Sequence, residues 1–128
     1  MLILKQTNLE ILPTGYILID GGKETAVQKV SNTKPIAQNN IDLILNTSLA
    51  GEFTGKKLIY LEAGSGATVP VGANIIKKCE SQLNIPLIVG GGIQTKKQLE
   101  TAFNAGADIV VIGTAFEKDI SFFNQLKK

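Results

Sequence analysis

Short apolar runs alternate along the chain with longer segments of mixed polarity. Residues 57–61, 86–89 and 109–112 are the clearest runs. They are short and rich in β-forming residues, so we predict that each forms a strand. A run that is apolar throughout, such as 86–89, is typical of a strand covered on both faces of its sheet.

Residues 9–12 and 16–19 are also extended and apolar, and Pro13 and Gly15 lie between them. Proline has no N–H group to donate to a central ladder, so we predict a first strand with a break or bulge near Pro13, ending at residues 20–22. Residues 23–34 are polar and rich in turn-forming residues. They predict a long loop, and such loops often line or cover binding sites.

Between the runs, apolar residues recur at the spacing of three and four that is typical of helices. One helix is expected between Pro35 and Gly51, and another between Pro70 and Asn84. Thr95 is a credible N-cap for a third, and a terminal helix is expected after a short turn at 115–118. The residues expected to pack these helices are Ile41, Ile44, Leu45, Leu49, Ile75, Ile76, Cys79, Leu83, Leu99, Ala102, Phe103, Ile120, Phe123 and Leu126.

The predicted order is β-α-β-α-β-α-β-α in a single domain, residues 1–128. Alternation of this kind indicates an α/β fold in which parallel strands are joined by right-handed crossovers. In such folds ligands bind outside the carboxyl ends of the strands. The residues that follow each predicted strand are therefore the first place to look for chemistry.

Composition excludes several function classes. The chain is 44% hydrophobic and 19% charged, as a folded domain should be, and its net charge of +2 gives no reason to expect a nucleic-acid surface. It has no histidine and one cysteine, which excludes a zinc site, a Ser-His-Asp triad and a Cys-His pair within these residues. No apolar run reaches membrane-spanning length and the start lacks a signal pattern, so a cytoplasmic protein is expected.

Small residues follow three of the predicted strands. They are residues 62–66 (Glu-Ala-Gly-Ser-Gly), residues 90–92 (three glycines) and the pair Gly113 and Thr114. Glycine lets main-chain N–H groups approach an anion closely, and in (β/α)8 barrels the loops after the last two strands form the usual phosphate site. Each loop alone could be a tight turn, but the two later loops in tandem favour a phosphate site.

Glu62 stands directly after the central strand, next to this predicted site. It could accept hydrogen bonds from substrate hydroxyls or take a proton from one of them. The alternative is a glutamate that simply faces solvent. Tyr60 lies two residues earlier and points to the same face, where it either fills the core or reaches the ligand with its hydroxyl.

At these residues the sequence resembles the geranylgeranylglyceryl phosphate synthase family, which includes the bacterial heptaprenylglyceryl phosphate synthases. The run from Tyr60 to Gly66 (Tyr-Leu-Glu-Ala-Gly-Ser-Gly) is the most specific match, and residues 13–19, 30–33, 86–93 and 105–114 also match. The family fold is a (β/α)8 TIM barrel. The resemblance covers nearly the whole chain but only the second half of that barrel, strands five to eight.

The resemblance implies a prenyltransferase of phospholipid biosynthesis, a phosphoglycerol geranylgeranyltransferase. Family members use Mg²⁺ to join the hydroxyl of sn-glycerol 1-phosphate to geranylgeranyl or another prenyl diphosphate through an ether bond. The implied glycerol 1-phosphate contacts are Tyr60, Leu61, Glu62, Ala63, Gly64, Ser65, Gly66, Gly91, Gly92, Gly113 and Thr114, with Glu62 as the catalytic residue. The Mg²⁺ and diphosphate contacts are expected in the first half of the barrel, so the isolated chain is expected to be inactive.

Two other functions stay open from the residues alone. The triple glycine also permits another phosphate-binding barrel synthase, of the thiamine-phosphate or indole-glycerol-phosphate type. The other is a non-catalytic half-barrel module, which either binds a phosphorylated ligand or serves only to form an assembly. Since half of a barrel cannot close on itself, open sheet edges and an apolar face would remain. We therefore expect a homo-oligomer or pairing with the missing half.

Overall fold

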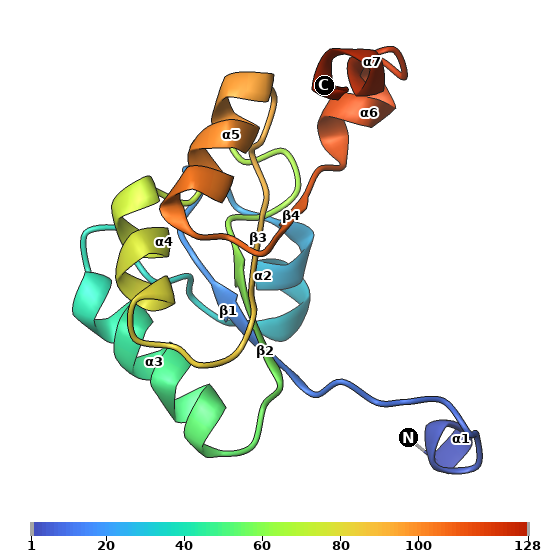
Figure 1. Cartoon of the computed structure of the whole chain (residues 1–128), viewed down its shortest axis with the longest axis vertical. Coiled ribbons are helices and arrows are strands. Elements are labelled where there is room, and N and C mark those ends of the chain that lie inside the picture. The colour runs from blue at the N-terminus through green and yellow to red at the C-terminus, as the bar shows by residue number, and fades with distance from the viewer. Residues whose placement is uncertain (1, 128) are drawn as a thin grey trace.

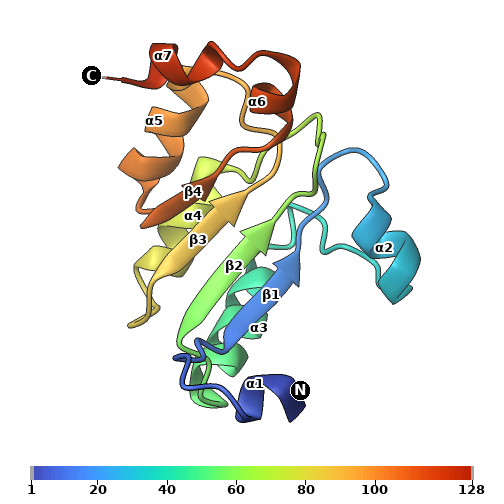
Figure 2. The same ribbon diagram turned by 90° about the vertical axis from the view of Figure 1, so that its right-hand side faces the viewer.

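The computed structural model describes residues 2–127, so both limits of the predicted domain, residues 1 and 128, lie outside it. Its centre is a four-stranded parallel sheet in the order β1-β2-β3-β4. The strands are β1 (Thr14–Leu18), β2 (Leu58–Glu62), β3 (Leu87–Gly90) and β4 (Ile109–Val111). Figure 2 shows them side by side with their carboxyl ends at one edge.

Three longer helices alternate with these strands. They are α3 (Ile41–Phe53), α4 (Ala73–Glu80) and α5 (Lys96–Ala105), and they lie on one face of the sheet (Figures 1 and 2). The shorter helices are α1 (Leu2–Lys5), α2 (Ala26–Ser31), α6 (Thr114–Lys118) and α7 (Phe122–Leu126). The predicted fold of parallel β/α units is therefore confirmed.

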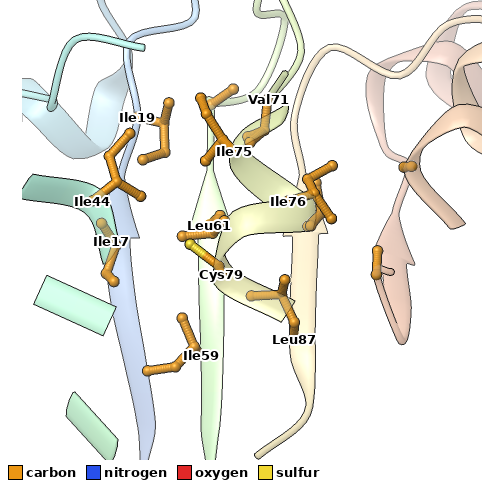
Figure 3. Close-up of a cluster of buried hydrophobic side chains, with 14 of the residues drawn as sticks. Ile17, Ile19, Ile44, Ile59, Leu61, Val71, Ile75, Ile76, Cys79 and Leu87 are labelled. Atoms are coloured by element: carbon orange, nitrogen blue, oxygen red, sulfur yellow. The ribbon is translucent and has the colours of Figure 1, made fainter. Parts of the chain in front are cut away.

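The core lies between the sheet and the three helices, and Figure 3 shows its central part. Alternate strand residues such as Ile59, Leu61 and Val89 point toward the helices and are fully buried. They meet Ile75 and Ile76 of α4 in one apolar cluster. Each such side chain contributes about 1.5–3 kcal/mol by leaving water, so this layer supplies most of the driving force for folding.

The other face of the sheet, which we call the inner face, carries no helix within residues 2–127. Tyr16, Tyr60, Ile88 and Ile109 form one row across it, in register. Tyr16 and Ile109 are 47% and 48% exposed, which is high for large apolar side chains on a sheet. The described residues therefore leave the inner face open.

Two predictions about the first third of the chain are wrong. Residues 9–12 do not form a strand; they extend from the sheet with the N-terminal segment, and β1 begins only at Thr14, after Pro13. Residues 23–34 are not a continuous loop, because they contain α2. Its signal is a capping box, in which the Thr25 side chain accepts from the N–H of Gln28 and the Gln28 side chain accepts from the N–H of Thr25.

The expected packing residues are mostly buried or half-buried, with exceptions toward the C-terminus. Phe103 on α5 is 46% exposed, although helical spacing placed it on the packed face. In the last helix Phe122 is the buried side chain, while Ile120 and Phe123 are exposed. The helix begins at Phe122, after a turn, so the spacing counted from Ile120 set the wrong face.

We predict that Thr95→Ala lowers the free energy of unfolding by about 1 kcal/mol, because α5 loses its N-cap. Thr95 Oγ1 accepts from the N–H of Gln98 at 3.1 Å, and the Gln98 side chain accepts from the N–H of Thr95 at 3.2 Å. Urea denaturation at fixed protein concentration measures the change. Thr101→Ala on the same helix is the matched control, because its hydroxyl only donates to Lys97 O. Equal stability of the two variants would contradict the prediction.

Candidate functional site

The loops after β2, β3 and β4 meet at one edge of the sheet and enclose a cavity. Glu62 and Gly66 from the first loop, Gly91 and Gly92 from the second, and Gly113 from the third are among its lining residues. The complete lining is Tyr60, Glu62, Ser65, Gly66, Gly91, Gly92, Ile93, Gln94, Val111, Ile112, Gly113 and Thr114. The structure thus brings together most of the residues that the sequence singled out.

Glu62 is buried, with 8% of its surface exposed, and it does not face open solvent. The N–H of Gly64 donates to Glu62 Oε1 at 2.7 Å. The Tyr60 side chain lies next to the same carboxylate. The amide of Gly64 thus holds one oxygen of Glu62 in place. A carboxylate has about four acceptor positions, so about three remain for other donors, the Tyr60 hydroxyl and a ligand among them.

Tyr60 is held in its protonated form by this arrangement. Burial of its ring raises the pKa of the Tyr60 hydroxyl, and its interaction with the neighbouring Glu62 carboxylate raises it further. The ring of Tyr16 stands edge-on to that of Tyr60, with centroids 5.1 Å apart. Burial and the charge of Glu62 also raise the pKa of Tyr16. Tyr60 consequently acts toward Glu62 as a hydrogen-bond donor.

Gly91 and Gly92 are positions where only glycine fits. Both have positive φ, +87° and +76°. A Cβ on Gly91 would lie 2.6 Å from the N and O atoms of Gly64 and 2.8 Å from Glu62 Oε1. A Cβ on Gly92 would lie 3.1 Å from Ala67 O and Pro70 N. The two loops are thus in backbone contact, which places the triple glycine directly against Glu62.

Main-chain N–H groups at this edge are free to bind a ligand. Within residues 2–127, the amides of Gly91, Gly92 and Ile93 donate no hydrogen bond. The same holds for Gly113, Thr114 and Ala115, where the first amides of α6 have no acceptor in the helix. Two sets of unpaired N–H groups beside one cavity suit an anion with several oxygens, such as phosphate.

Three predicted contacts lie outside this cavity. The side chains of Leu61 and Ala63 are buried in the core on the helix side of the sheet. The amide of Gly64 is engaged by Glu62 and is not free for a phosphate. Side chains alternate between the two faces along a strand, so Leu61 points away from the inner face that Tyr60 and Glu62 share. This alternation could have excluded Leu61 from the site on sequence alone.

Sequence reasoning missed Ile93, Gln94, Val111 and Ile112, all of which line the cavity. Val111 pairs with Gly90 in the sheet and is on the same face as Glu62, so its place followed from strand alternation. Lys23 was missed too: its Nζ lies 3.8 Å from the position of a Cβ on Gly66. The loop between β1 and α2 therefore adds a positive charge at the rim.

The structure offers no complete metal site. Among the described residues no group of three His, Cys, Asp or Glu side chains comes together. Glu62 is the one carboxylate among the residues that line the cavity. Of the helices in residues 2–127, none has the length and apolar character required to cross a bilayer.

Comparison with known proteins places this site in context. The geranylgeranylglyceryl phosphate synthase of Zunongwangia profunda is 60% identical over 114 residues, which are 89% of this chain and 49% of that protein. The protein of the same name from Flavobacterium johnsoniae is 57% identical over 122 residues, 95% of this chain and 50% of that protein. The chain therefore spans about half the length of the curated relatives it matches.

A solved structure agrees with these relatives. The (S)-3-O-geranylgeranylglyceryl phosphate synthase of Thermoplasma acidophilum, in complex with its substrate sn-glycerol-1-phosphate, superposes with a TM-score of 0.89. It is 34% identical and matches 98% of this chain and 50% of its own. The resemblance seen in the sequence is confirmed. A model of the PcrB family matches residues 2–128, and the chain belongs to that family.

Proposed function

We propose that this chain forms the glycerol-1-phosphate-binding half of a prenyltransferase that joins sn-glycerol 1-phosphate to a prenyl diphosphate through an ether bond. The observation that carries the proposal is the pair of free amide sets, at residues 91–93 and 113–115, beside the buried carboxylate of Glu62, which the Gly64 amide holds in place. The names of the relatives and the substrate bound in the Thermoplasma acidophilum enzyme support the same substrate.

The phosphate group is held by the free amides. Gly91, Gly92 and Ile93 approach it from the end of β3, and Gly113, Thr114 and Ala115 approach it from the end of β4. Main-chain N–H groups fixed by their loops need no reorganisation when the anion arrives, which favours tight binding. The Lys23 ammonium group at the rim adds a long-range attraction for the dianion.

Glu62 and Tyr60 act on the glycerol part. The remaining acceptor positions of Glu62 take hydrogen bonds from the glycerol hydroxyls, and Tyr60 keeps the carboxylate aimed at them. One hydroxyl oxygen then attacks the first carbon of the prenyl group. The new C–O bond forms as the bond to diphosphate breaks, and Glu62 accepts the hydroxyl proton. Diphosphate leaves with the bonding electron pair.

The prenyl chain requires an apolar surface. A second cavity, beside β1 and α2, is lined mostly by apolar groups, including Tyr16, Leu18, Val27 and Ile36. Tyr16 connects it to the first cavity through its edge-on contact with Tyr60. We propose that part of the prenyl chain lies in this groove. The length of the prenyl group that fits would then depend both on this groove and on the half of the barrel that residues 1–128 do not span.

Mg²⁺ remains a prediction from the family resemblance. The described residues bring no set of ligands together, and Glu62 already accepts a hydrogen bond from the Gly64 amide. Any Mg²⁺ site would therefore need ligands from the other half of the barrel, as would the contacts to diphosphate. The place in phospholipid synthesis and the cytoplasmic location likewise remain predictions.

Glu62→Gln tests the role of the carboxylate. An amide keeps the shape but removes the charge, and its NH₂ group cannot accept the bonds that Gly64, Tyr60 and the glycerol hydroxyls donate. We expect at least about a tenfold loss of affinity for sn-glycerol 1-phosphate, because a charged hydrogen bond is worth about 1.5–3 kcal/mol. Calorimetry on the chain measures it. Glu100→Gln, on the exposed face of α5, is the control. Unchanged affinity in Glu62→Gln would refute the assignment.

Gly113→Ala tests the amide cage. A Cβ at this position meets no atom within 4 Å and φ is negative, −123°, so the added methyl group neither clashes with a neighbour nor requires the left-handed region. The added methyl group would stand where the phosphate approaches Gly113 and Thr114. We expect an unchanged melting temperature and about a tenfold or greater loss of affinity for glycerol 1-phosphate. Unaltered affinity would show that the phosphate does not approach Gly113.

We propose further that the inner face is covered by another copy of the chain when the chain is alone. Sedimentation at micromolar concentration should then show a species larger than a monomer. Ile109→Lys places a charge on that face and should shift the chain toward the monomer, because its ammonium group would be buried in the contact. Phe53→Lys, at an exposed apolar position at the end of α3, should leave the association unchanged. A monomeric wild-type chain would contradict the proposal.

A further inference from the structure

Gln38 lies in the segment between α2 and α3, outside the cavity of the proposed substrate site. It stands two residues after Ile36, which forms an isolated parallel bridge with Ile19 just beyond β1. It also lines a separate cavity with Pro70, Gly72 and residues of α5. A half-buried glutamine that joins several loops requires an explanation of its hydrogen bonds.

The side-chain amide of Gln38 makes three hydrogen bonds. Its Nε2 donates to Asp20 O at 2.9 Å and to Pro70 O at 3.0 Å. Its Oε1 accepts from the N–H of Gly72 at 3.0 Å. The partners fix the orientation of the amide, since two carbonyl groups need a donor and an N–H group needs an acceptor. One side chain thus ties the loop after β1 to the loop after β2 and to the start of α4.

A second set of bonds joins the same two loops. Gly21 O accepts from the N–H groups of Thr68 and Val69 at 3.0 and 3.1 Å, and from the Thr68 hydroxyl at 3.1 Å. Those bonds hold the middle of the loop after β2, whereas Gln38 holds its last residues. If the Gln38 side chain were removed, the segment from Pro70 to Gly72 would lose the hydrogen bonds that connect it to the loop after β1.

The segment that Gln38 holds is the one that supports Gly92. A Cβ on Gly92 would lie 3.1 Å from Pro70 N and 3.2 Å from Pro70 Cα, so the two backbones are in contact. The free amides of Gly92 and Ile93 are therefore aimed by the position of Pro70. A group that binds a ligand works only when the residues around it hold it within a fraction of an ångström of the required position.

We propose that Gln38 is a positioning residue: it fixes the Pro70–Gly72 segment against Gly92 and thereby sets the direction of the phosphate-binding amides. The inference rests on the proposed function, because it assumes that those amides bind a phosphate group. Gln38 does not contact the ligand itself. Its loss should weaken every phosphate-bearing ligand by the same factor, whatever is attached to the phosphate.

The first test compares two ligands on the same chain, inorganic phosphate and sn-glycerol 1-phosphate. Binding is followed by the amide NMR signals of Gly92 and Gly113. Gln38→Met keeps the length of the side chain and removes its hydrogen bonds. We expect about a tenfold loss of affinity for both ligands. Glu62→Gln should weaken only glycerol 1-phosphate. Gln82→Met, at an exposed glutamine, is the matched control.

The outcomes separate the two proposals. Gln38→Met binding both ligands within about twofold of wild type would overturn the role of Gln38 while leaving the proposed function intact. A loss for glycerol 1-phosphate alone would overturn it as well, since that pattern belongs to a contact with the glycerol. A wild-type chain that binds neither ligand would overturn the proposed function and this inference with it.

A second variant covers the case in which Gln38→Met does not fold. In Gln38→Glu the ionised carboxylate cannot donate to Asp20 O or Pro70 O, whereas its protonated form donates one bond. The affinity relative to wild type should therefore be lowest near about pH 8 and rise toward about pH 5. The nearby Asp20 carboxylate and Lys97 are present in both proteins, so the ratio removes their titration and that of the ligand. A ratio that does not vary with pH would overturn the proposal.

Discussion

The backbone contact between the end of β3 and the loop after β2 is the constraint on which the site depends. Gly91 has no room for a Cβ because Gly64 and Glu62 occupy the space, and its φ lies in the region that favours glycine. That contact brings a row of amides and a carboxylate into one cavity. Any larger residue at position 91 would push the loops apart and separate the amides at the end of β3 from Glu62.

This arrangement also resolves an electrostatic conflict. A carboxylate beside a phosphate dianion repels it, and burial of Glu62 makes the repulsion stronger. The N–H of Gly64 satisfies part of the negative charge of Glu62, and unpaired amides follow two strands at the same cavity. In the proposed complex the glycerol carbons would separate the two anions. A ligand that presented its phosphate directly to Glu62 would be repelled, so the proposed substrate would bind in one orientation.

The sequence predicted the parallel β/α order and most of the cavity, because glycines and apolar runs are local signals. The predicted start of the first strand was wrong. Residues 9–12 are apolar and extended like a strand, but in the structure they have no neighbouring strand to pair with, so β1 begins after Pro13. Helix α2 was missed because a capping box of Thr25 and Gln28 lay within a polar stretch. Gln38 could not have been found, since its three partners are distant in sequence and meet only through folding.

The uncovered inner face has a consequence beyond assembly. Aromatic and branched side chains such as those of Tyr16 and Ile109 are the surfaces that chaperones bind and that proteases reach in incompletely buried proteins. Any copy of this sheet whose inner face is left uncovered would therefore be open to chaperone binding and to proteolysis. Covering that face is thus a condition for the folded protein to persist, as well as for the site to be complete.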